Sequence, residues 1–479
     1  MPLFRSTLTA AVLLTASACT PDPSDSADSS PPPVPCEAPQ GEHAEDSWGG
    51  DTRVQLEATG FFRTAKLCDR WWIVTPEGHP TWSTGVNTVN PNGDTDGVTG
   101  ERLYAQAVDA AYDSDEAWAE ATAARLRSWG FNTTGAWSAH ELTLPHIAAT
   151  PILYIAGYDW LDGTRSDWFD PSWPEGVEAK AADLAVLADE PNILGWFLDN
   201  EISWGPDWRG LDTLLQAYLG MDAEAPGKAV AVDFLLSELG DVAAVNSATG
   251  NDFTDRDAML AAAGAWDALD QDSSDTERAL TSAFLTLAAE YYFGTVATAI
   301  RAHDPNHMLM GNREVSVLTR LEVYQAAAQH MDILSINNYR FVDGMADGSV
   351  GLSGAVDPAD GFAALTADVD MPILISEFGF RADDSGLPNS WPPIYPTYDT
   401  QTERADAFEA YALEHQASPW VVGYHWFEWV DQPQGGRSMD GEDNNWGVVN
   451  EQDQVYTELT ERMTTVNAEI HGLLAVERD

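Results

Sequence analysis

GWFLDNEISWG, residues 195–205, opens on apolar residues suited to a buried strand and ends on Asp199, Asn200 and Glu201. A hydrophobic strand that finishes in two carboxylates and an amide has two interpretations. One is a solvated strand end. The other is that Glu201 is half of a catalytic pair, which requires a partner elsewhere in the chain.

Short apolar runs that end in polar or aromatic residues recur along the chain, and we interpret them as strands separated by helices. The helical stretches between them include 115–130 and 178–190. This alternation predicts an α/β fold, a (β/α)₈ TIM barrel, with a long helical insertion after strand four at about 206–304. The expected strands are 81–87, 131–137, 151–158, 193–201, 307–314, 331–339, 372–380 and 421–429.

The residues at the expected strand ends are unusually polar and aromatic. In a (β/α)₈ barrel the active site is built from the C-terminal ends of the strands and the loops that follow them. Eight strand ends therefore direct their side chains into one basin, which a plain core does not require. The strand-end residues are Asn87, Trp137, Tyr158, Asn200, Glu201, Arg313, Glu314, Asn337, Asn338, Tyr339, Glu377, His425 and Trp426.

The predicted partner of Glu201 is Glu377, in the stretch MPILISEFGF at 371–380, where Ser376 and Glu377 follow the buried run 371–375. These glutamates end strands four and seven, which face each other across the mouth of a barrel. Glycosidic cleavage uses two carboxyl groups, one to protonate the leaving oxygen and one to attack the sugar or activate water. A separation of about 5–5.5 Å implies retention of configuration, and about 6.5–9.5 Å implies inversion. The alternative is that both glutamates cap strands or pair with arginine.

The composition restricts the partner. The 479 residues include 77 acidic and 23 basic side chains, with a net charge of −54. This charge argues against nucleic acid, which requires Lys and Arg, and against an anionic membrane surface. It favours an uncharged or cationic partner, and 19 Trp leave aromatic side chains for a binding surface.

The N-terminus predicts export. Residues 1–19 contain a short apolar run and end at Cys19, a pattern expected of a lipoprotein signal in which Cys19 is lipidated, with ordinary cleavage near Ala18 as the alternative. Residues 20–50, rich in Pro, Ser and Asp at their start, are expected to form a tether ahead of a catalytic domain at 51–479. Cys36 and Cys68 are then a candidate disulfide, with two unpaired thiols as the alternative.

Other motifs give weaker signals. Residues 90–97 resemble the start of a calcium loop, but Leu103 stands where the closing Glu should be, which favours a solvated turn. The chain has no HExxH spacing, serine-hydrolase elbow or P-loop, and we expect no metal and no cofactor. In the long loop 431–447, Arg437, Asp440 and Glu442 are expected either to bind sugar hydroxyls or to pair with one another.

Beyond these patterns, the chain resembles glycoside hydrolase clan A, and within it most resembles the β-agarases of family 50. The Asn200-Glu201 pair with a later Glu377 matches the clan pattern, and the blocks at 71–87 and 424–450 carry the narrower likeness. The other matching segments are 126–137, 195–205, 332–339 and 372–380.

The resemblance implies an acid/base role for Glu201 and a nucleophile role for Glu377. It also implies that residues near them hold the sugar and tune the carboxylates. The expected substrate-binding residues are Asn87, Trp137, Asn200, Trp204, Asn338, Tyr339, His425, Trp426 and Arg437.

The leading hypothesis is an exported, retaining glycoside hydrolase that acts on a galactan such as agarose or its oligosaccharides. The first alternative is a clan A β-galactosidase, β-mannanase or β-glucanase with the same carboxylates and a different cleft. The second is a surface lipoprotein that binds glycans without catalysis, although a pure binder needs neither Glu201 nor Glu377. The expected partner is a polysaccharide or oligosaccharide, with membrane contact only through an N-terminal lipid.

Overall fold

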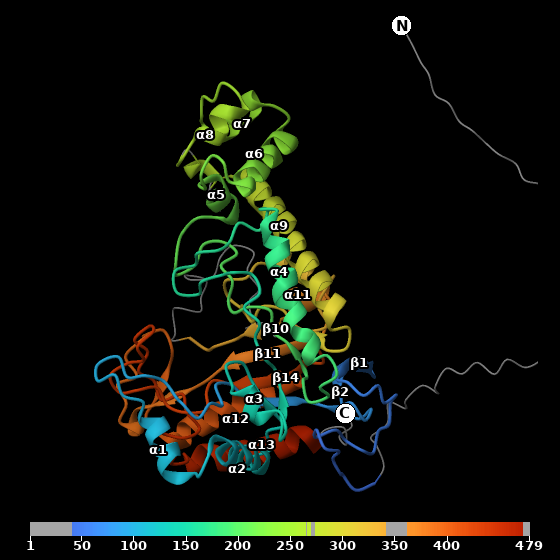
Figure 1. Cartoon of the computed structure of the whole chain (residues 1–479), viewed down its shortest axis with the longest axis vertical. Coiled ribbons are helices and arrows are strands. Elements are labelled where there is room, and N and C mark those ends of the chain that lie inside the picture. The colour runs from blue at the N-terminus through green and yellow to red at the C-terminus, as the bar shows by residue number, and fades with distance from the viewer. Residues whose placement is uncertain (1–40, 265, 270–273, 342–361, 473–479) are drawn as a thin grey trace, which may run out of the picture. The chain divides into compact units, whose positions relative to one another are not determined.

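The main feature of the computed structural model is a seven-stranded parallel sheet in the order β6-β5-β4-β14-β11-β10-β9 (Figure 1). The structure describes residues 41–264, 266–269, 274–341 and 362–472. Neighbouring parallel strands need long crossover connections, commonly helical, so this sheet requires the strand–helix alternation seen in the sequence. The strands are β4 (Ser83–Val86), β5 (Thr133–Thr134), β6 (Ala148–Ala149), β9 (Glu314–Val315), β10 (Leu334–Asn337), β11 (Ile373–Phe378) and β14 (Val421–Trp426).

A separate two-stranded parallel sheet pairs β7 (Gly195–Trp196) with β8 (Met308–Leu309). An isolated parallel bridge connects Ile193, just ahead of β7, to Ala149 in β6. On the other side, the amide of Ile333, just ahead of β10, donates to the last carbonyl of β8 at 3.3 Å. The α/β class and the parallel arrangement are confirmed, while a complete (β/α)₈ barrel stays a prediction.

Two expected strands differ from the structure. The strand expected at 151–158 is misplaced, because β6 ends just before this range and Pro151 then removes a backbone donor. The strand expected at 307–314 is divided into β8 and the start of β9. Gly311 and Arg313, which lie between them, have φ values of 74° and 55°, outside the extended region.

Helices connect the strands, and several begin at well-formed caps. α2 starts after Ser114, whose hydroxyl accepts from the amide three residues on, and α12 starts with a capping box between Thr400 and Glu403. The helix expected at 115–130 is confirmed, and the one at 178–190 corresponds to the end of α4 with η1. The helices are α1 (Leu103–Ala111), α2 (Asp115–Ser128), α3 (His140–Thr143), α4 (Ser172–Ala182), η1 (Asp183–Val186), α10 (Leu321–Ala327), α11 (Ala363–Asp368), α12 (Gln401–Ala417) and α13 (Thr457–Gly472).

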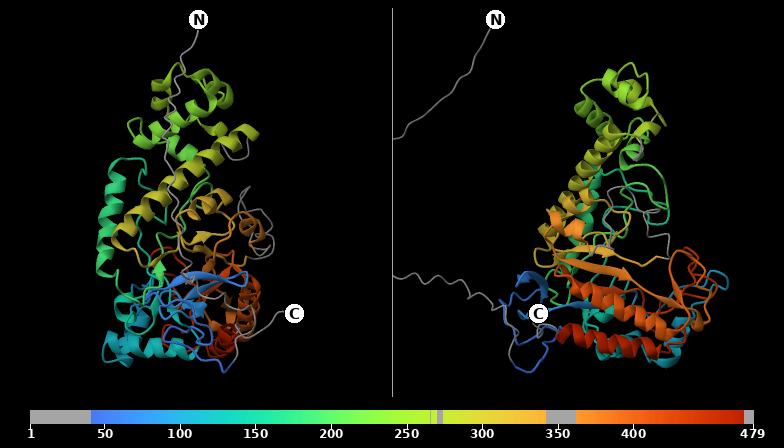
Figure 2. Two further views of the ribbon diagram at one scale, coloured as in Figure 1. Left: turned by 90° about the vertical axis from the view of Figure 1, so that its right-hand side faces the viewer. Right: turned by 180° about the vertical axis from the view of Figure 1, so that it is seen from behind.

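The expected insertion at 206–304 is mainly helical. Its long helix α9 packs against α4 and α10 with one part and against α5 and α6 with another. Figures 1 and 2 show α5 to α8 gathered at the N-terminal end of α9, away from the strands. The elements are α5 (Leu214–Leu219), α6 (Pro226–Leu239), α7 (Val242–Thr249), α8 (Arg256–Ala261), η2 (Asp267–Leu269) and α9 (Asp275–His303).

Helix α9 is long and apolar enough to cross a membrane by length and composition. Its most apolar window is 56% buried inside the protein, and three of its four aromatic residues, Phe284, Tyr292 and Phe293, are fully buried. The packing against α4 and α10 accounts for this apolar character.

Two further small sheets are separate from the seven-stranded sheet. Cys68 follows directly after β1 of the first. Cys68 is disulfide-bonded. The export signal at 1–19, most of the tether, the lipidation candidate Cys19 and the disulfide candidate Cys36 lie outside the described residues, so those assignments stay predictions. The strands are β1 (Arg63–Leu67), β2 (Arg70–Val74) and β3 (Pro80–Thr81), then β12 (Arg381–Ala382) and β13 (Thr397–Tyr398), with η4 (Asp383–Ser385) after β12.

Candidate active site

Two glutamates from different strands converge on one amide group. Glu201 follows β7, and Glu377 lies in β11. Asn337, the last residue of β10, donates from Nδ2 to Glu201 Oε1 at 2.8 Å and to Glu377 Oε2 at 3.4 Å. Since both distances start at the same nitrogen, the two carboxylate oxygens are no farther apart than the sum of these distances. The structure therefore brings together the two residues that were predicted as a pair.

Both glutamates line a cavity of about 370 Å³, which we call the acidic cavity. The predicted site residues that line it are Trp137, Asn200, Glu201, Tyr339, Glu377 and Arg437. The other lining residues are Thr88, Asn90, Gly93, Asp94, Tyr154, Trp160, Tyr395, Phe427, Glu428, Val430, Met439, Glu442 and Trp446.

The Glu377 carboxylate is surrounded by hydrogen-bond donors. Tyr339 donates its hydroxyl to Oε1 at 2.7 Å, and the Arg313 guanidinium pairs with Oε2. Burial raises the pKa of Glu377 to about 7; the Glu201 carboxylate adds to this effect, whereas Arg313 and Tyr339 oppose it. The contact between Tyr339 and Glu377 was expected from the sequence, and Arg313 was named only as a strand-end residue.

Arg313 is a fully buried cation beneath the acidic cavity. It donates to Asn200 Oδ1 at 2.9 Å and to the Ser376 carbonyl at 3.0 Å, in addition to its pair with Glu377. Its guanidinium also lies 4.4 Å from the centre of the Trp137 ring. A planar guanidinium with several fixed donors can hold groups from different strands in one arrangement. Arg313 thus connects the region of Glu201 to Glu377.

Glu201 is fixed by contacts on both its side chain and its backbone. Trp160 donates from Nε1 to Oε2 at 2.7 Å, which with the Asn337 bond gives each carboxylate oxygen a donor. Its amide donates to the Asn312 carbonyl at 2.9 Å, and its carbonyl accepts from Arg209 at 2.9 Å. Sequence reasoning missed Trp160 because it lies in the loop after β6 and not at a strand end.

Several residues around the acidic cavity have a left-handed backbone. Glu201, Trp137, Tyr154 and Thr88 have φ values of 50°, 60°, 51° and 57°, and all four line the cavity. Non-glycine residues rarely adopt this conformation, and its energetic cost is commonly found at functional sites. Here the conformation turns side chains at or just beyond the strand ends toward the cavity.

Five of the residues predicted to bind the substrate are buried and do not line the acidic cavity. His425 is bonded to Ser83 Oγ at 2.8 Å, and burial lowers its pKa to about 3, so the ring is neutral. Trp426 donates from Nε1 to the carbonyl of Trp446 at 2.8 Å. Asn87 donates to the carbonyl of residue 376 at 3.1 Å. These side chains bond to other parts of the protein near the strand ends, and their contact with substrate stays a prediction.

The remaining two, Trp204 and Asn338, are also occupied by the protein. Trp204 donates from Nε1 to Glu314 Oε2 at 2.9 Å and stacks on Phe293, with ring centres 5.7 Å apart. Asn338 Nδ2 is bonded to His415 Nε2 at 2.9 Å. Alternation along a strand or loop does not reveal which side chain is bonded within the protein in this way, and their contact with substrate stays a prediction.

In the loop that follows β14, the charged residues pair with one another, while their binding of sugar hydroxyls stays a prediction. Arg437 lies 2.7 Å from Asp440 and 3.1 Å from Glu442, so the loop is internally paired. Arg437 and Glu442 also line the acidic cavity. The ion pairs therefore hold charged groups at the cavity wall.

Glu428 is a functional candidate that the sequence analysis did not identify. It lines the acidic cavity, and its Oε2 accepts from Thr88 Oγ1 at 2.9 Å. Its buried Oε1 has no hydrogen-bond partner among the described residues. Burial and the neighbouring Asp94 carboxylate raise the pKa of Glu428 well above its usual value. An uncharged carboxyl with one free oxygen can donate to, or accept from, a sugar hydroxyl.

A second cavity of about 840 Å³ adjoins the acidic cavity, and we call it the aromatic cavity. Glu201 lines both cavities, whereas Glu377 lines the acidic cavity alone. Trp160, Tyr339, Tyr395 and Glu442 are also shared. The aromatic cavity is otherwise lined by Leu161, Pro206, Asp207, Trp208, Leu211, Val315, Val317, Leu318, Asn337, Phe341, Trp391, Pro392, Pro393, Ile394 and Asp440.

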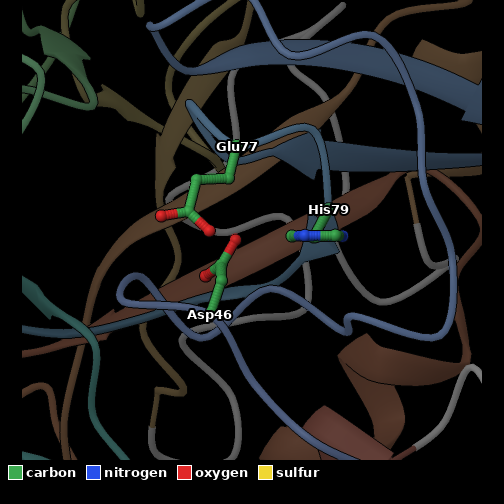
Figure 3. A group of neighbouring side chains, drawn as sticks. All are labelled: Asp46, Glu77 and His79. Carbon is green, nitrogen blue, oxygen red and sulfur yellow. The ribbon is translucent and has the colours of Figure 1, made fainter.

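One group of side chains outside the two cavities has the composition of a metal site. Asp46, Glu77 and His79 place one ligand atom each within 4.8 Å of one another (Figure 3). Asp46 already accepts from two backbone amides of its own turn and from the Thr75 hydroxyl, and His79 Nδ1 is bonded to a backbone carbonyl. We interpret this group as part of the turns around β2 and β3.

The stretch 90–97 forms the expected turn. Asp96 accepts from the amides of Val98, Thr99 and Gly435 at 2.8, 2.7 and 3.0 Å, which uses its carboxylate for local structure. These bonds connect the turn to the loop after β14.

The sequence relatives of the chain are β-agarases. No protein-family model matches it. β-Agarase A of Vibrio sp. (strain JT0107) is 30% identical over 394 residues, which are 77% of this chain and 38% of the relative. β-Agarase B of the same strain is 24% identical over 496 residues, which are 88% of this chain and 49% of the relative. The chain thus spans less than half the length of either relative.

Solved structures of agarases share the fold. One agarase is 26% identical with a TM-score of 0.73, over 89% of this chain and 67% of the other. An exo-β-agarase is 23% identical with a TM-score of 0.75, again over 89% and 67%. The expected resemblance to β-agarases is therefore confirmed in sequence and in fold.

Proposed function

We propose that this chain is a glycoside hydrolase of clan A that cleaves β-galactosidic bonds of agarose or agaro-oligosaccharides with retention of configuration. The observation that carries the proposal is the convergence of Glu201 and Glu377 on Asn337 at the wall of one cavity. The similarity to two β-agarases supports the galactan substrate.

In the proposed reaction, protonated Glu201 gives its proton to the glycosidic oxygen as the bond to the anomeric carbon breaks. The Glu377 carboxylate attacks that carbon and forms a covalent glycosyl-enzyme. Glu201, now ionised, takes a proton from water, and the water oxygen attacks the same carbon and releases Glu377. Two displacements on one carbon give net retention.

The short separation of the carboxylates supports retention. The distances from Asn337 Nδ2 to the two oxygens, 2.8 and 3.4 Å, limit the gap between those oxygens. Their sum is below the about 6.5–9.5 Å that inverting enzymes need to hold a water. A direct attack by Glu377 is therefore the better match to this geometry.

The surrounding side chains support distinct roles in this reaction. Tyr339 and Arg313 donate to Glu377 and favour its ionised form. Asn200 uses Oδ1 to accept from Arg313 and lines the acidic cavity, so its amide nitrogen is available to a sugar hydroxyl. Hydrogen bonds to the 2-OH strengthen as the transition state forms.

We also propose that the parallel strands form a closed (β/α)₈ barrel. The bridge from β6 toward β7 and the bond from the segment ahead of β10 to β8 support this closure. Such a barrel would place the ends of β7, β10 and β11 at one mouth, as the bonds of Asn337 require. Export, with lipidation at Cys19, is a further proposal that rests on the sequence of residues 1–19 alone.

The test is hydrolysis of a polysaccharide panel by the protein without residues 1–40, with agarose, porphyran, galactan, mannan and β-glucan as substrates. Reducing ends are measured for the wild type, Glu201→Gln and Glu377→Gln. Glu458→Gln, at an exposed position in α13, is the matched control. We expect activity on agarose that both site variants lose and the control keeps. Activity on another glycan and not on agarose would reject the agarose assignment. No hydrolysis of any of the five glycans by a folded protein would reject the proposed function.

The stereochemical course is tested separately. Proton NMR during the first minutes of agaro-oligosaccharide hydrolysis shows which anomer is released before mutarotation. We expect the β-anomer, because two displacements restore the configuration. Initial release of the α-anomer would reject the role of Glu377 as a nucleophile.

A further inference from the structure

We infer that the aromatic cavity binds the leaving-group side of the galactan chain, and that Trp208 and Trp391 are its sugar platforms. The inference rests on the proposed function, because it uses the roles of Glu201 and Glu377. A general acid must lie beside the oxygen that leaves, whereas the nucleophile must lie beside the anomeric carbon. Glu201 lines both cavities and Glu377 lines the acidic cavity alone. The bond to be cleaved therefore lies at the boundary, with the leaving sugar in the aromatic cavity.

The two tryptophans are exposed although they are large and apolar. Trp208 is 55% exposed and Trp391 is 54% exposed, and both line the aromatic cavity. Exposed apolar surface rimmed by polar groups is typical of ligand-binding grooves. The face of a pyranose ring carries C–H groups, which pack on a flat indole while the ring hydroxyls remain at its edge. An indole also loses little conformational freedom on binding.

Trp208 is positioned relative to the acid by its neighbour Arg209. The Arg209 guanidinium lies 4.0 Å from the centre of the Trp208 ring and pairs with Asp207 at 2.7 Å. The same side chain donates to the carbonyl of Glu201 at 2.9 Å and to the carbonyl of Trp160 at 3.1 Å. One buried cation therefore connects the platform to the acid and to the residue that donates to it.

Trp391 is fixed through the backbone around it. Its amide donates to Asp443 Oδ1 at 3.0 Å, and its carbonyl accepts from Asn444 Nδ2 at 2.7 Å. Arg381 donates to the carbonyl of Pro392 at 3.3 Å. These bonds hold the backbone on both sides of the indole, so the platform is available before a sugar binds.

The charges of the aromatic cavity favour a neutral sugar. Among the described residues that line it, all charged side chains are carboxylates: Glu201, Asp207, Asp440 and Glu442. Sulfate or carboxylate groups on the leaving-side sugar would meet these like charges without a lining cation. The ligand class is therefore an uncharged galactan segment.

The test compares two substrates that share the attacked sugar and differ in the leaving group. One is an agaro-oligosaccharide, and the other is the glycosyl fluoride of the same glycone, which places no sugar in the aromatic cavity. For Trp208→Ala and Trp391→Ala, we expect kcat/KM on the oligosaccharide to fall about tenfold or more. On the fluoride we expect values within about twofold of wild type, since the stacked ring is absent.

A second readout is transglycosylation, in which the glycosyl-enzyme is attacked by an added sugar and not by water. An added agaro-oligosaccharide captures the glycosyl-enzyme and gives a longer product, and we expect both alanine variants to need a higher acceptor concentration for half-maximal transfer. Trp208→Phe should restore most of this binding because it keeps a flat ring. Val186→Ala, at an 86% exposed apolar position lining neither cavity, is the control. The thermal midpoint of each variant checks folding.

The outcomes separate the inference from the function. Equal losses on both substrates, or no loss on either, would overturn the platform role while the wild-type activity stands. Losses confined to the fluoride would place the tryptophans on the glycone side and would also overturn it. Wild-type silence on both substrates would reject the proposed function and the platform together.

Discussion

The acidic cavity and the aromatic cavity meet at Glu201 but are built differently. The acidic cavity contains the ends of the strands, carries Glu377 and Glu428, and has the buried Arg313 beneath it. The aromatic cavity is formed largely by loops, including residues 206–211 of the insertion. In the proposed function, the chemistry would use the strand ends, which the sheet fixes, whereas binding of further sugar units would use loop residues.

The largest effect is expected from Glu377→Ala, which removes the proposed nucleophile from the acidic cavity and leaves the lining of the aromatic cavity unchanged. We expect hydrolysis of agaro-oligosaccharides to fall on the order of 10⁴-fold. Calorimetry should show that oligosaccharide binding persists. Azide, which fits the space left by the carboxylate, should restore turnover and give the α-glycosyl azide. A variant that stays active without azide would contradict the assignment.

Arg313→Gln tests the buried ion pair between Arg313 and Glu377. Removing one partner of a buried ion pair leaves an unpaired charge, and we expect a loss of about 3–5 kcal/mol in unfolding free energy. We also expect the acid limb of kcat/KM to move to higher pH, because Arg313 lowers the pKa of Glu377. Arg313→Lys, which keeps the charge, should show a smaller shift. Chemical denaturation and a pH–rate profile measure both effects, and an unchanged acid limb would contradict them.

The pH profile of the wild type reports the ionisation of Glu377 in the acidic cavity. Burial raises the pKa of Glu377 to about 7, and attack requires its ionised form. As the pH falls below 7, the carboxylate fraction falls, so we expect kcat/KM to decrease about tenfold per pH unit. Measurement of kcat/KM from pH 4 to 9 checks this limb. A limb centred near the ordinary value of a glutamate would show that the donors around Glu377 outweigh its burial.

Trp160→Phe acts at the boundary between the cavities. It removes the Nε1 donor to Glu201 Oε2 and keeps most of the aromatic surface. Glu201 becomes a carboxylate as it gives up its proton in the proposed reaction, and a hydrogen bond to a charged group contributes about 1.5–3 kcal/mol. We therefore expect roughly a tenfold or larger loss in kcat/KM on an oligosaccharide. Trp391→Phe is a matched change that removes no bond to Glu201. Equal losses in the two variants would argue against the hydrogen bond as the cause.

Glu428→Gln should have the smallest effect. Burial and Asp94 raise the pKa of Glu428 well above its usual value, which favours the uncharged carboxyl that a glutamine mimics. We expect less than about a threefold change in kcat/KM near neutral pH, whereas removal of the group by Glu428→Ala should cost more. Steady-state kinetics on one oligosaccharide compare the two variants. Equal losses would show that charge, and not hydrogen bonding, is the property that matters.

The local pattern was enough for part of this result. Strand-length apolar runs ending in Asn200-Glu201 and Glu377 suggested the pair, and the helical stretch at 115–130 corresponds to α2. The sequence pattern did not show which side chains at the strand ends point into the cavity and which point into the core. Asn87 and His425 were therefore expected at the substrate, although both are buried. The deciding variable is the local backbone direction, including positive φ values at non-glycine residues such as Glu201.

By itself, the sequence determined the α/β class, the two glutamates and the likeness to β-agarases, because apolar period and residue type are properties of neighbouring positions. Only the tertiary structure decided that Asn337 joins the glutamates, that Arg313 lies beneath them, and that Trp208 faces a second cavity. These contacts connect residues far apart in the chain. Their distances depend on how strands and loops pack, which no local pattern contains.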